Sequence, residues 1–500
     1  MWRRRDVLSA GAVAAVAPSI LTACADKDSD VVAPVETGAV EPPGDTAPTD
    51  TPVEPPPDTP GETPLDSGDD SGLDTGEGPA GIPFDADAVL VNPAFDEAVR
   101  SGAMTTSTAV AITRARGLTS VRVRVWEPTP TAGVVLLAFE ADLVPNDGGY
   151  VRADVTGLVA GRSYRYGFFV VDPLGAFVGR SDLGVFRTAP ATGDLPTLTL
   201  ALLSCNGNAT GRRDAIGRVA DHAEIDLLLH VGDMVYNDGA VSRADYRASW
   251  ASWMQSVGYR EGLARAGMYA TWDDHEVDND WNPQTIAVGQ LANAAASWVE
   301  NVPMAPGPTG LLWSQWRWGD TAEVFLLDCR SERLPSSRTT LGQYLSRAQM
   351  DWLKNGLLTS TAHFKIVANS VPITNMPGLW DFGAADRWEG YEAQRDEILD
   401  FIAANNIGNV WFVSGDFHVC FVGKVQPGGV GILNKTWEIA VTSGNVNPLG
   451  ANLNPPQYLF GSAQPHLGVL VFDPVADTVT TRFYDPATDR LVDEQVLTQA

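Results

Sequence analysis

The sequence predicts an α/β protein in which a layered body with mixed sheets follows a smaller all-β module. From about residue 191 to the C-terminus, continuous apolar runs alternate with helical segments, which is typical of sheets covered by helices. Between 81 and about 190, short alternating stretches separated by turn residues show no helical periodicity, which is typical of a small β-sandwich. The length of 500 residues exceeds one ordinary core and agrees with two folded units.

The first 24 residues, MWRRRDVLSAGAVAAVAPSILTAC, predict an export signal. Three arginines precede an apolar run, Val7 to Ile20, that is too short to span a bilayer comfortably. The run from Leu21 to Cys24 resembles a bacterial lipobox, and Arg4-Arg5 resembles a twin-arginine signal, with an ordinary Sec signal as the alternative. We therefore expect a periplasmic or cell-surface lipoprotein that meets the membrane only through a lipid anchor at Cys24.

Residues 25 to 80 form an acidic segment rich in Pro, Thr and Asp. This segment holds fifteen acidic residues, one lysine and eleven prolines, but no aromatic residue. Such a composition cannot bury enough surface to offset the entropy of ordering, so we expect a disordered, self-repelling linker. The whole chain carries a formal net charge of −28, half of it from this segment, and that charge disfavours nucleic acid as a partner.

The module from 81 to about 190 contains five stretches that each suit a strand. They are TAVAITRA, SVRVRVWEP, GVVLLAFEADL, GYVRADVTGL and RSYRYGFFVVD. The stretch from Thr156 to Tyr164 resembles the strand-turn-strand of a fibronectin-III-like domain. Because no chemistry-bearing cluster lies in the module, we expect a structural or positioning role, with a carbohydrate- or substrate-presenting surface as the alternative.

Polar clusters follow four of the strands expected in the body. LALLS runs into Ser204-Cys205-Asn206, LLLHVG into Asp233, MYATW into TWDDHEVDND at 271 to 280, and VWFVSG into Asp416-Phe417-His418. Ligands of open α/β sheets gather beyond the carboxyl ends of the strands, so these clusters are expected to converge on one edge.

The types of side chain in these clusters favour metal. Asp and Asn oxygens suit hard cations, His suits transition metals, and thiolate or phenolate suits iron. Asp233 follows Gly232, so one carboxylate could bridge two ions. Two ions about 3.5–4 Å apart can clamp a phosphoryl group for in-line attack.

From about residue 83 onward, the chain resembles the PhoD-like alkaline phosphatases within the calcineurin-like metallophosphoesterases. The resemblance is carried by FDEAVRSGAMTTSTAVAITRA, HVGDMVY, TWDDHEVDN, FLLDCRSER, LGQYLSRAQMDWL and SGDFH, which occur in the family's order. It implies a fibronectin-III-like PhoD N-terminal domain over 81–190 and a PhoD-like metallophosphatase domain over 191–500. It also implies an exported phosphoesterase with one Fe³⁺ and one or two Ca²⁺.

Five residues match positions of the family's metal centre. The resemblance implies that Cys205, Asp233 and Tyr236 bind iron, and that Asp233 also bridges to calcium. Asp416 and His418 fill the final G-D-x-H block. For Cys205, a buried structural thiol is the alternative.

The TWDDHEVDND segment and the LDCR block supply the other candidates. Asp274 and Asn279 are expected as further metal ligands, although the pattern does not settle which of Asp273, Asp274 and Asn279 contacts metal. His275 lies where the wider superfamily places a proton donor, which would protonate the leaving alkoxide or orient phosphate. Arg330 matches a family arginine expected to steady phosphate or a loop.

The function expected from these residues is hydrolysis of phosphate monoesters or diesters by a monomeric enzyme. Two alternatives stay open at this point. One is a catalytically silent surface lipoprotein that binds ligands through its β-sandwich. The other is a phospholipase D-like phosphodiesterase that uses the anchor to meet phospholipid.

Overall fold

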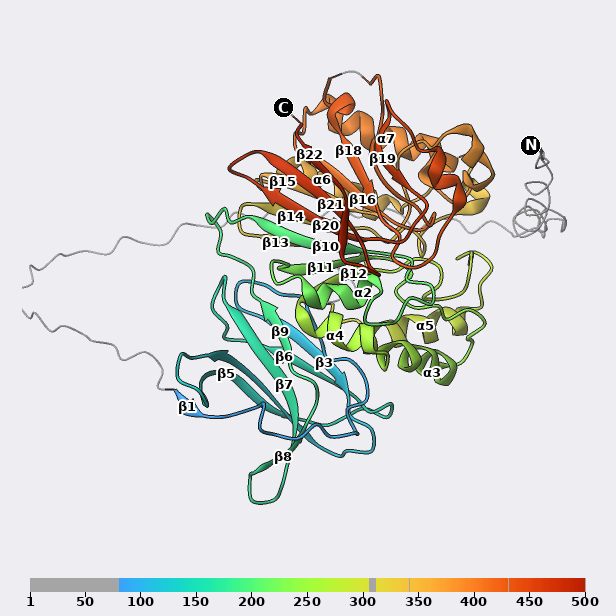
Figure 1. Ribbon diagram of the computed structural model, residues 1–500. Coiled ribbons are helices and arrows are strands. Elements are labelled where there is room, and N and C mark those ends of the chain that lie inside the picture. The colour runs from blue at the N-terminus through green and yellow to red at the C-terminus, as the bar shows by residue number, and fades with distance from the viewer. Residues whose placement is uncertain (1–80, 305–311, 341, 430, 500) are drawn as a thin grey trace, which may run out of the picture. The chain divides into compact units, whose positions relative to one another are not determined.

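A computed structural model describes residues 81–304, 312–340, 342–429 and 431–499 (Figure 1). The expected signal and linker, 1–80, lie outside these residues. Among the helices of the described residues, none is long and apolar enough to cross a membrane. The described residues between 81 and 499 cluster into one compact unit.

A nine-stranded sheet runs through the middle of this unit. Its strands lie in the order β22-β21-β20-β10-β11-β12-β2-β3-β6. In that order they span Arg490–Leu497, Thr478–Asp485, Leu467–Asp473, Leu198–Leu203, Leu227–Val231, Gly267–Thr271, Arg100–Gly102, Ala109–Arg114 and Tyr150–Val155. β10, β11 and β12 are parallel to one another, so their carboxyl ends share one edge of the sheet.

A seven-stranded sheet contains the other strands of the body. Its order is β13-β14-β15-β16-β18-β17-β19. These strands span Ser314–Trp318, Ala322–Leu326, Phe364–Ala368, Val410–Ser414, Trp437–Ala440, Cys420–Lys424 and Tyr458–Ser462. β14, β15, β16 and β18 are parallel, whereas β13, β17 and β19 pair antiparallel, so the sheet is mixed.

The two sheets pack face to face and helices cover their outer faces. One apolar cluster joins Leu200 and Leu229 of the nine-stranded sheet to Val324 and Ile366 of the seven-stranded sheet. The helices α2 (Ala215–Arg218), α3 (Arg243–Met254), α4 (Val257–Arg265) and α5 (Val288–Asn301) contribute to a second cluster, and α6 (Arg347–Thr359) and α7 (Glu392–Ala404) to a third. Figure 1 shows the two helical groups on opposite outer sides. This layered arrangement buries every residue of the central strands β10, β11, β12, β14, β16 and β18.

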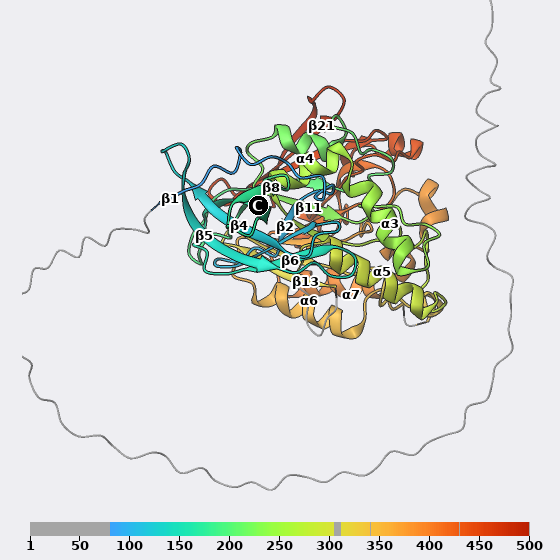
Figure 2. The same cartoon turned by 90° about the horizontal axis from the view of Figure 1, so that it is seen from below.

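The β module divides its strands between two sheets. A six-stranded sheet contains β1 (Ile82–Pro83), β4 (Val121–Pro128), β5 (Val134–Leu143), β7 (Ser163–Val171), β8 (Phe177–Arg180) and β9 (Gly184–Arg187). Figure 2 shows β4 and β5 side by side, and they pair antiparallel. The module's other strands, β2, β3 and β6, extend the body's nine-stranded sheet through the pairing of β2 with β12. The domain boundary near residue 190 and the fibronectin-III likeness stay predictions.

Candidate metal centre

The backbone turns sharply at four of the predicted site residues, directly beyond the strands β10, β11 and β16. Cys205, Asp233, Asp416 and His418 have φ angles of 51°, 58°, 64° and 57°. Such left-handed conformations are costly for residues other than glycine, and strained residues of this kind cluster at functional sites. The strand ends are therefore shaped to aim these side chains rather than to continue the sheets.

Gly232 and Glu276 keep the turn at Asp233 in close contact with Asp273, which lies beyond the end of β12. A Cβ atom at Gly232 would lie 2.5 Å from the Cβ atom of Asp273, so only glycine allows this approach. The buried carboxylate of Glu276 accepts hydrogen bonds from the backbone N–H groups of Asp233 (3.1 Å), Met234 (2.6 Å) and Asp273 (2.8 Å). One side chain thus fixes two strand ends relative to each other.

Three groups of potential metal-binding side chains overlap at Asp233. The first group joins Cys205 and His418 to Asp233, and the second joins Asp274 and His275 to it. The third contains Asp233, Asp273, Asp274 and Asp416. Within each group, the potential ligand atoms lie within 4.8 Å of one another. The structure therefore brings together seven residues that the sequence singled out, and Asp233 is the carboxylate that the three groups share.

The first group fits a transition-metal ion. Burial lowers the pKa of His418 to about 4, helped by the nearby His275, so its imidazole is neutral and free to bind metal. Burial and the charge of Asp233 raise the pKa of the Cys205 thiol well above its ordinary value. The Tyr236 hydroxyl lies 3.5 Å from Asp233 Oδ2. Thiol, phenol and imidazole donors around one carboxylate match the preferences of iron.

The second and third groups fit a hard cation. Burial and the charges of Asp274 and Asp273 raise the pKa of Asp233 well above its ordinary value. Burial and the charge of Asp273 do the same for Asp416. The Oδ1 atoms of Asp233 and Asp274 are buried without a hydrogen-bond partner. Buried carboxylate oxygens without partners are costly, and a cation bound between them would remove that cost.

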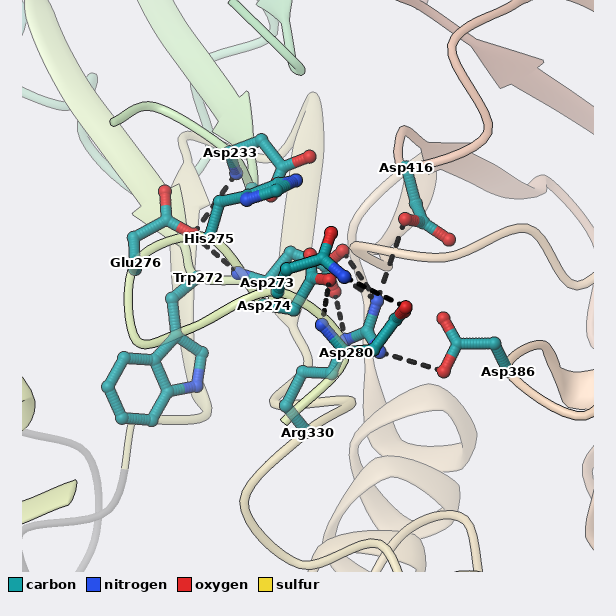
Figure 3. A network of polar contacts seen from close by, with 12 residues as sticks. Asp233, Trp272, Asp273, Asp274, His275, Glu276, Asp280, Arg330, Asp386 and Asp416 are labelled. Atoms are coloured by element: carbon teal, nitrogen blue, oxygen red, sulfur yellow. Dashed lines mark hydrogen bonds and ion pairs between the residues drawn. The ribbon is translucent and has the colours of Figure 1, made fainter. Parts of the chain in front are cut away.

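Asp273 and Asp274 differ in how their oxygens are used (Figure 3). Both oxygens of Asp273 accept from Arg330, at 2.6 and 2.8 Å. Asp274 instead accepts from the backbone N–H of Asp280 through Oδ2, which leaves Oδ1 without a partner. Burial raises the pKa of Asp274, but the charges of Arg330 and His275 outweigh burial and leave it below the ordinary value. Asp274 is therefore the better placed of the two for a cation.

Arg330 lies beneath the carboxylates rather than beside an open cavity. Its side chain is 0% exposed, and Nη1 donates to Asp386 at 2.8 Å. Nη2 also lies 3.7 Å from Asp274 Oδ1 and 3.5 Å from Asp416 Oδ1. Its donors are thus occupied by protein carboxylates, including one from the 375–392 loop (Figure 3). This geometry fits the expectation that Arg330 steadies a loop better than the expectation that it contacts phosphate.

Asn279 and His275 lie on the outer side of the cluster. Asn279 is exposed, its backbone N–H donates to Asp238 at 2.8 Å, and its amide donates to Asp280 at 2.9 Å. The Asn279 amide thus contacts Asp280, and its place as a metal ligand stays a prediction. The Nδ1 atom of His275 lies 2.8 Å from Asp238. Burial lowers the pKa of His275, but the Asp238 and Asp274 carboxylates outweigh burial and raise it.

Four polar residues around the cluster were missed by sequence reasoning. They are Asp238, Glu276, Asp386 and Asn445. Asn445 donates from Nδ2 to the Tyr236 hydroxyl at 2.6 Å and lies 3.4 Å from His418 Nε2. Glu276 and Asp238 stand inside or next to the quoted motifs, so proximity could have suggested them. No signal in the sequence marks Asp386 or Asn445.

Solved structures of phosphatases share this fold. A structure of PhoD superposes with a TM-score of 0.67 at 22% identity, covering 81% of this chain and 89% of that one. The purple acid phosphatase PPD1 from yellow lupin (Lupinus luteus) seeds superposes with a TM-score of 0.58 at 12% identity, covering 80% and 74%. These likenesses confirm the predicted fold class of the body. Stacked mixed sheets with potential metal-binding side chains at their strand ends define a metallophosphoesterase-like fold.

The family follows from the sequence comparison. A family model of PhoD-like phosphatases matches residues 200–473, more than half of the chain, so the chain belongs to the PhoD-like phosphatase family. Alkaline phosphatase D of Bacillus subtilis (strain 168) is 28% identical over an alignment of length 327, and the match covers 55% of this chain and 54% of that protein. The chain thus spans about half the length of this curated relative.

Proposed function

We propose that the protein hydrolyses phosphate monoesters or diesters at the cluster around Asp233. The observation that carries this proposal is the overlap of three potential metal-binding groups at this one carboxylate. Shared carboxylates of this kind hold two cations close enough to act on one phosphoryl group. The proposed enzyme is a monomer, since the three groups need no residue from a second subunit.

The metals proposed are one Fe³⁺ and one or two Ca²⁺. Cys205, Asp233, Tyr236 and His418 would hold the iron, and Asp233, Asp274 and Asp416 would hold calcium. When bound, the cations would supply positive charge that polarises the phosphoryl group and makes water a better nucleophile. A Tyr236–iron bond gives visible charge-transfer absorption. Iron-loaded protein without this colour would overturn the Tyr236 assignment and leave the phosphatase class standing.

The chain's own contribution to the reaction is proton donation and the positioning of carboxylates. A water oxygen forms a bond to phosphorus, and the bond from phosphorus to the leaving oxygen breaks. His275 gives the proton on Nε2 to that leaving oxygen and is restored by the proton that the attacking water releases. Arg330 keeps Asp273 and Asp386 in place beneath the reacting group.

The test is hydrolysis of p-nitrophenyl phosphate and bis-p-nitrophenyl phosphate by protein loaded with iron and calcium. We expect turnover of at least one ester and its loss after chelation. The ratio of the two rates gives the preference for monoester or diester. Absence of turnover of both esters, with both metals bound in stoichiometric amounts, would contradict the proposal.

Export is proposed on the sequence of residues 1–24, with twin-arginine transport and lipidation at Cys24. Arg4-Arg5 before the apolar run and the Leu21 to Cys24 motif support it. Replacing Cys24 by Ser should release the protein from the membrane fraction. Unchanged membrane association of that variant would contradict the lipid anchor.

A further inference from the structure

The imidazole of His275 is oriented by contacts on two sides. Its Nδ1 atom lies 2.8 and 2.9 Å from the two carboxylate oxygens of Asp238. Its ring lies against the Tyr236 ring, with centroids 4.0 Å apart and an interplanar angle of 33°. Trp253 packs on the same tyrosine at 5.8 Å. These contacts therefore restrict both the orientation of the His275 ring plane and the rotation of the ring about its side-chain bonds.

Asp238 is itself held in place by the segment that carries His275. Its Oδ1 atom accepts a hydrogen bond from the backbone N–H of Asn279 at 2.8 Å. The preceding residue, Asn237, donates its backbone N–H to the His275 carbonyl at 2.8 Å and its side-chain amide to the Glu276 carbonyl at 2.9 Å. These bonds join the segments 237–238 and 275–279 into one rigid unit, so the carboxylate is placed before substrate arrives.

Asp238 has no competing charge partner. Within the part of the chain that the structure describes, its ion pair is with His275, and no lysine or arginine pairs with it. The Asp238 side chain is 41% exposed, whereas that of His275 is 13% exposed. An exposed carboxylate without a basic partner contributes little to stability, so its two-oxygen contact with one imidazole nitrogen points to a role in orienting that ring.

The contact also determines which nitrogen faces the cluster. A carboxylate only accepts hydrogen bonds, so Nδ1 must carry a proton in this arrangement. A His275 nitrogen lies within 4.8 Å of carboxylate oxygens of Asp233 and Asp274. Figure 3 shows the imidazole beside Asp233. With Nδ1–H donated to Asp238, Nε2 is the nitrogen left for a ligand of the cluster.

We propose that Asp238 is a positioning residue that holds His275 with Nδ1–H donated outward and Nε2–H directed at the leaving oxygen of the ester. The inference rests on the proposed function and deepens it. Asp238 does not contact substrate, and it acts only through the imidazole. Its loss should therefore resemble a weaker form of the loss of His275.

The discriminating variant is Asp238→Asn, which keeps the shape of the side chain. The amide oxygen can still accept from Asn279, and the amide nitrogen is then presented to Nδ1, where it opposes the Nδ1–H form of the ring. We expect kcat for phenyl phosphate, whose leaving oxygen needs a proton, to fall about 10- to 100-fold. The kcat for p-nitrophenyl phosphate, a good leaving group, should fall less than about threefold, with KM and metal content unchanged.

A double-mutant cycle separates positioning from a structural role. Asp238→Asn added to His275→Asn should cause no further loss on phenyl phosphate, because the residue through which Asp238 acts is already gone. Asp278→Asn is the matched control. Asp278 Oδ1 accepts from the backbone N–H of Gly239 at 3.0 Å in the same pair of loops, whereas the His275 Nδ1 contact is with Asp238. This control should retain both rates.

Three outcomes would overturn the inference. They are equal losses on the two esters, unchanged rates in Asp238→Asn, and a further loss when Asp238→Asn is added to His275→Asn. The failure of the proposed function looks different, because wild-type protein with its metals bound would then hydrolyse neither ester.

Discussion

The carboxylates of the β module and those at the strand ends of the body differ in their exposure and in their basic partners. On the module's six-stranded sheet, Asp142 pairs with Arg122 across neighbouring strands at 2.7 Å, and Asp87 pairs with Arg165 at 3.0 Å. All four side chains remain between 27% and 64% exposed. At the strand ends, Asp233 is buried among other carboxylates and has no basic partner of its own.

The difference shows what each region needs in order to be stable. A module carboxylate is ionised at little cost, because water and an arginine both face it. The buried cluster has only Arg330 in ion-pair distance of Asp273, Asp274 and Asp416 within the described residues. Its remaining negative charge must be neutralised by protons or by bound cations. The same residue type is therefore structural on the module's sheet and poised for ligand binding at the strand ends.

The largest expected effect comes from Asp233→Asn, which removes the carboxylate shared by the three groups. We expect loss of bound metal and a fall in kcat/KM of at least about 100-fold, because even residues that only support metal ligands cost 10- to 100-fold. Metal analysis and p-nitrophenyl phosphate hydrolysis measure both effects. The matched change in the module, Asp142→Asn, should retain full metal content. Normal metal content in Asp233→Asn would contradict the inference that the buried carboxylates at the strand ends bind cations.

The strand-end positions of this cluster could be predicted from the sequence. Cys205, Asp233, Asp274, Asp416 and His418 each follow a continuous apolar run, and parallel strands place such residues at one edge. The runs themselves were recognisable because burial on both faces removes alternation. The place of each residue at the end of a predicted strand was therefore enough to predict which side chains lie close together.

Other parts of the site depended on side-chain contacts that the sequence motifs do not reveal. Asn279 stands in the same motif as Asp274, yet its side chain is directed at Asp280, because local hydrogen bonds set its rotamer. Asn445 reaches Tyr236 from a loop more than 200 residues away in the chain, and its local sequence carries no sign of that contact. Arg330 was expected near phosphate or a loop, and its orientation followed only once Asp386 was placed.

The helices show the same limit. One of the helical segments expected between the apolar runs of the body is RRDAIGRVADH, residues 212–222. The structure divides this stretch into α2 and a short 3₁₀ turn over Val219–Asp221. Gly217 packs so closely that a Cβ atom there would lie 2.6 Å from the Gly211 carbonyl oxygen. Gly217 lies within the short helix α2 and packs against the backbone of residues 211 and 212. Hydrophobic periodicity in the sequence does not reveal this contact.

A smaller effect is expected from pH on protein freed of metal. Burial, with the charge of Asp273, raises the pKa of Glu276 to about 7 from its ordinary 4.5. A carboxyl whose pKa is raised on folding contributes stability below its unfolded pKa and loses that contribution as pH rises through the folded value. The chelated protein should therefore be less stable at pH 8 than at pH 5.5, by about 2 kcal/mol from this group.

Urea unfolding of chelated protein at the two pH values measures this difference. Metal-loaded protein is the control, because bound cations stabilise the ionised cluster and should reverse or abolish the trend. Asp233 and Asp416, whose pKa values are also raised, add to the effect with the same sign. Equal stability of the chelated protein at both pH values would mean that the buried carboxylates are neutralised from within the fold.

The smallest effect is expected for Asp142→Asn on the module's sheet. The Arg122 hydrogen bond lowers the pKa of Asp142, so the pair contributes stability above the ordinary pKa of 3.8 and loses it as pH falls further. Since Asp142 is 58% exposed, solvent screens the pair, and the free energy of unfolding should fall by only about 0.2–1 kcal/mol at neutral pH. Urea midpoints at low and high salt measure this loss, which should shrink as salt rises. A loss above about 2 kcal/mol that persists in salt would show that module carboxylates are as dependent on their partners as the buried cluster is on cations.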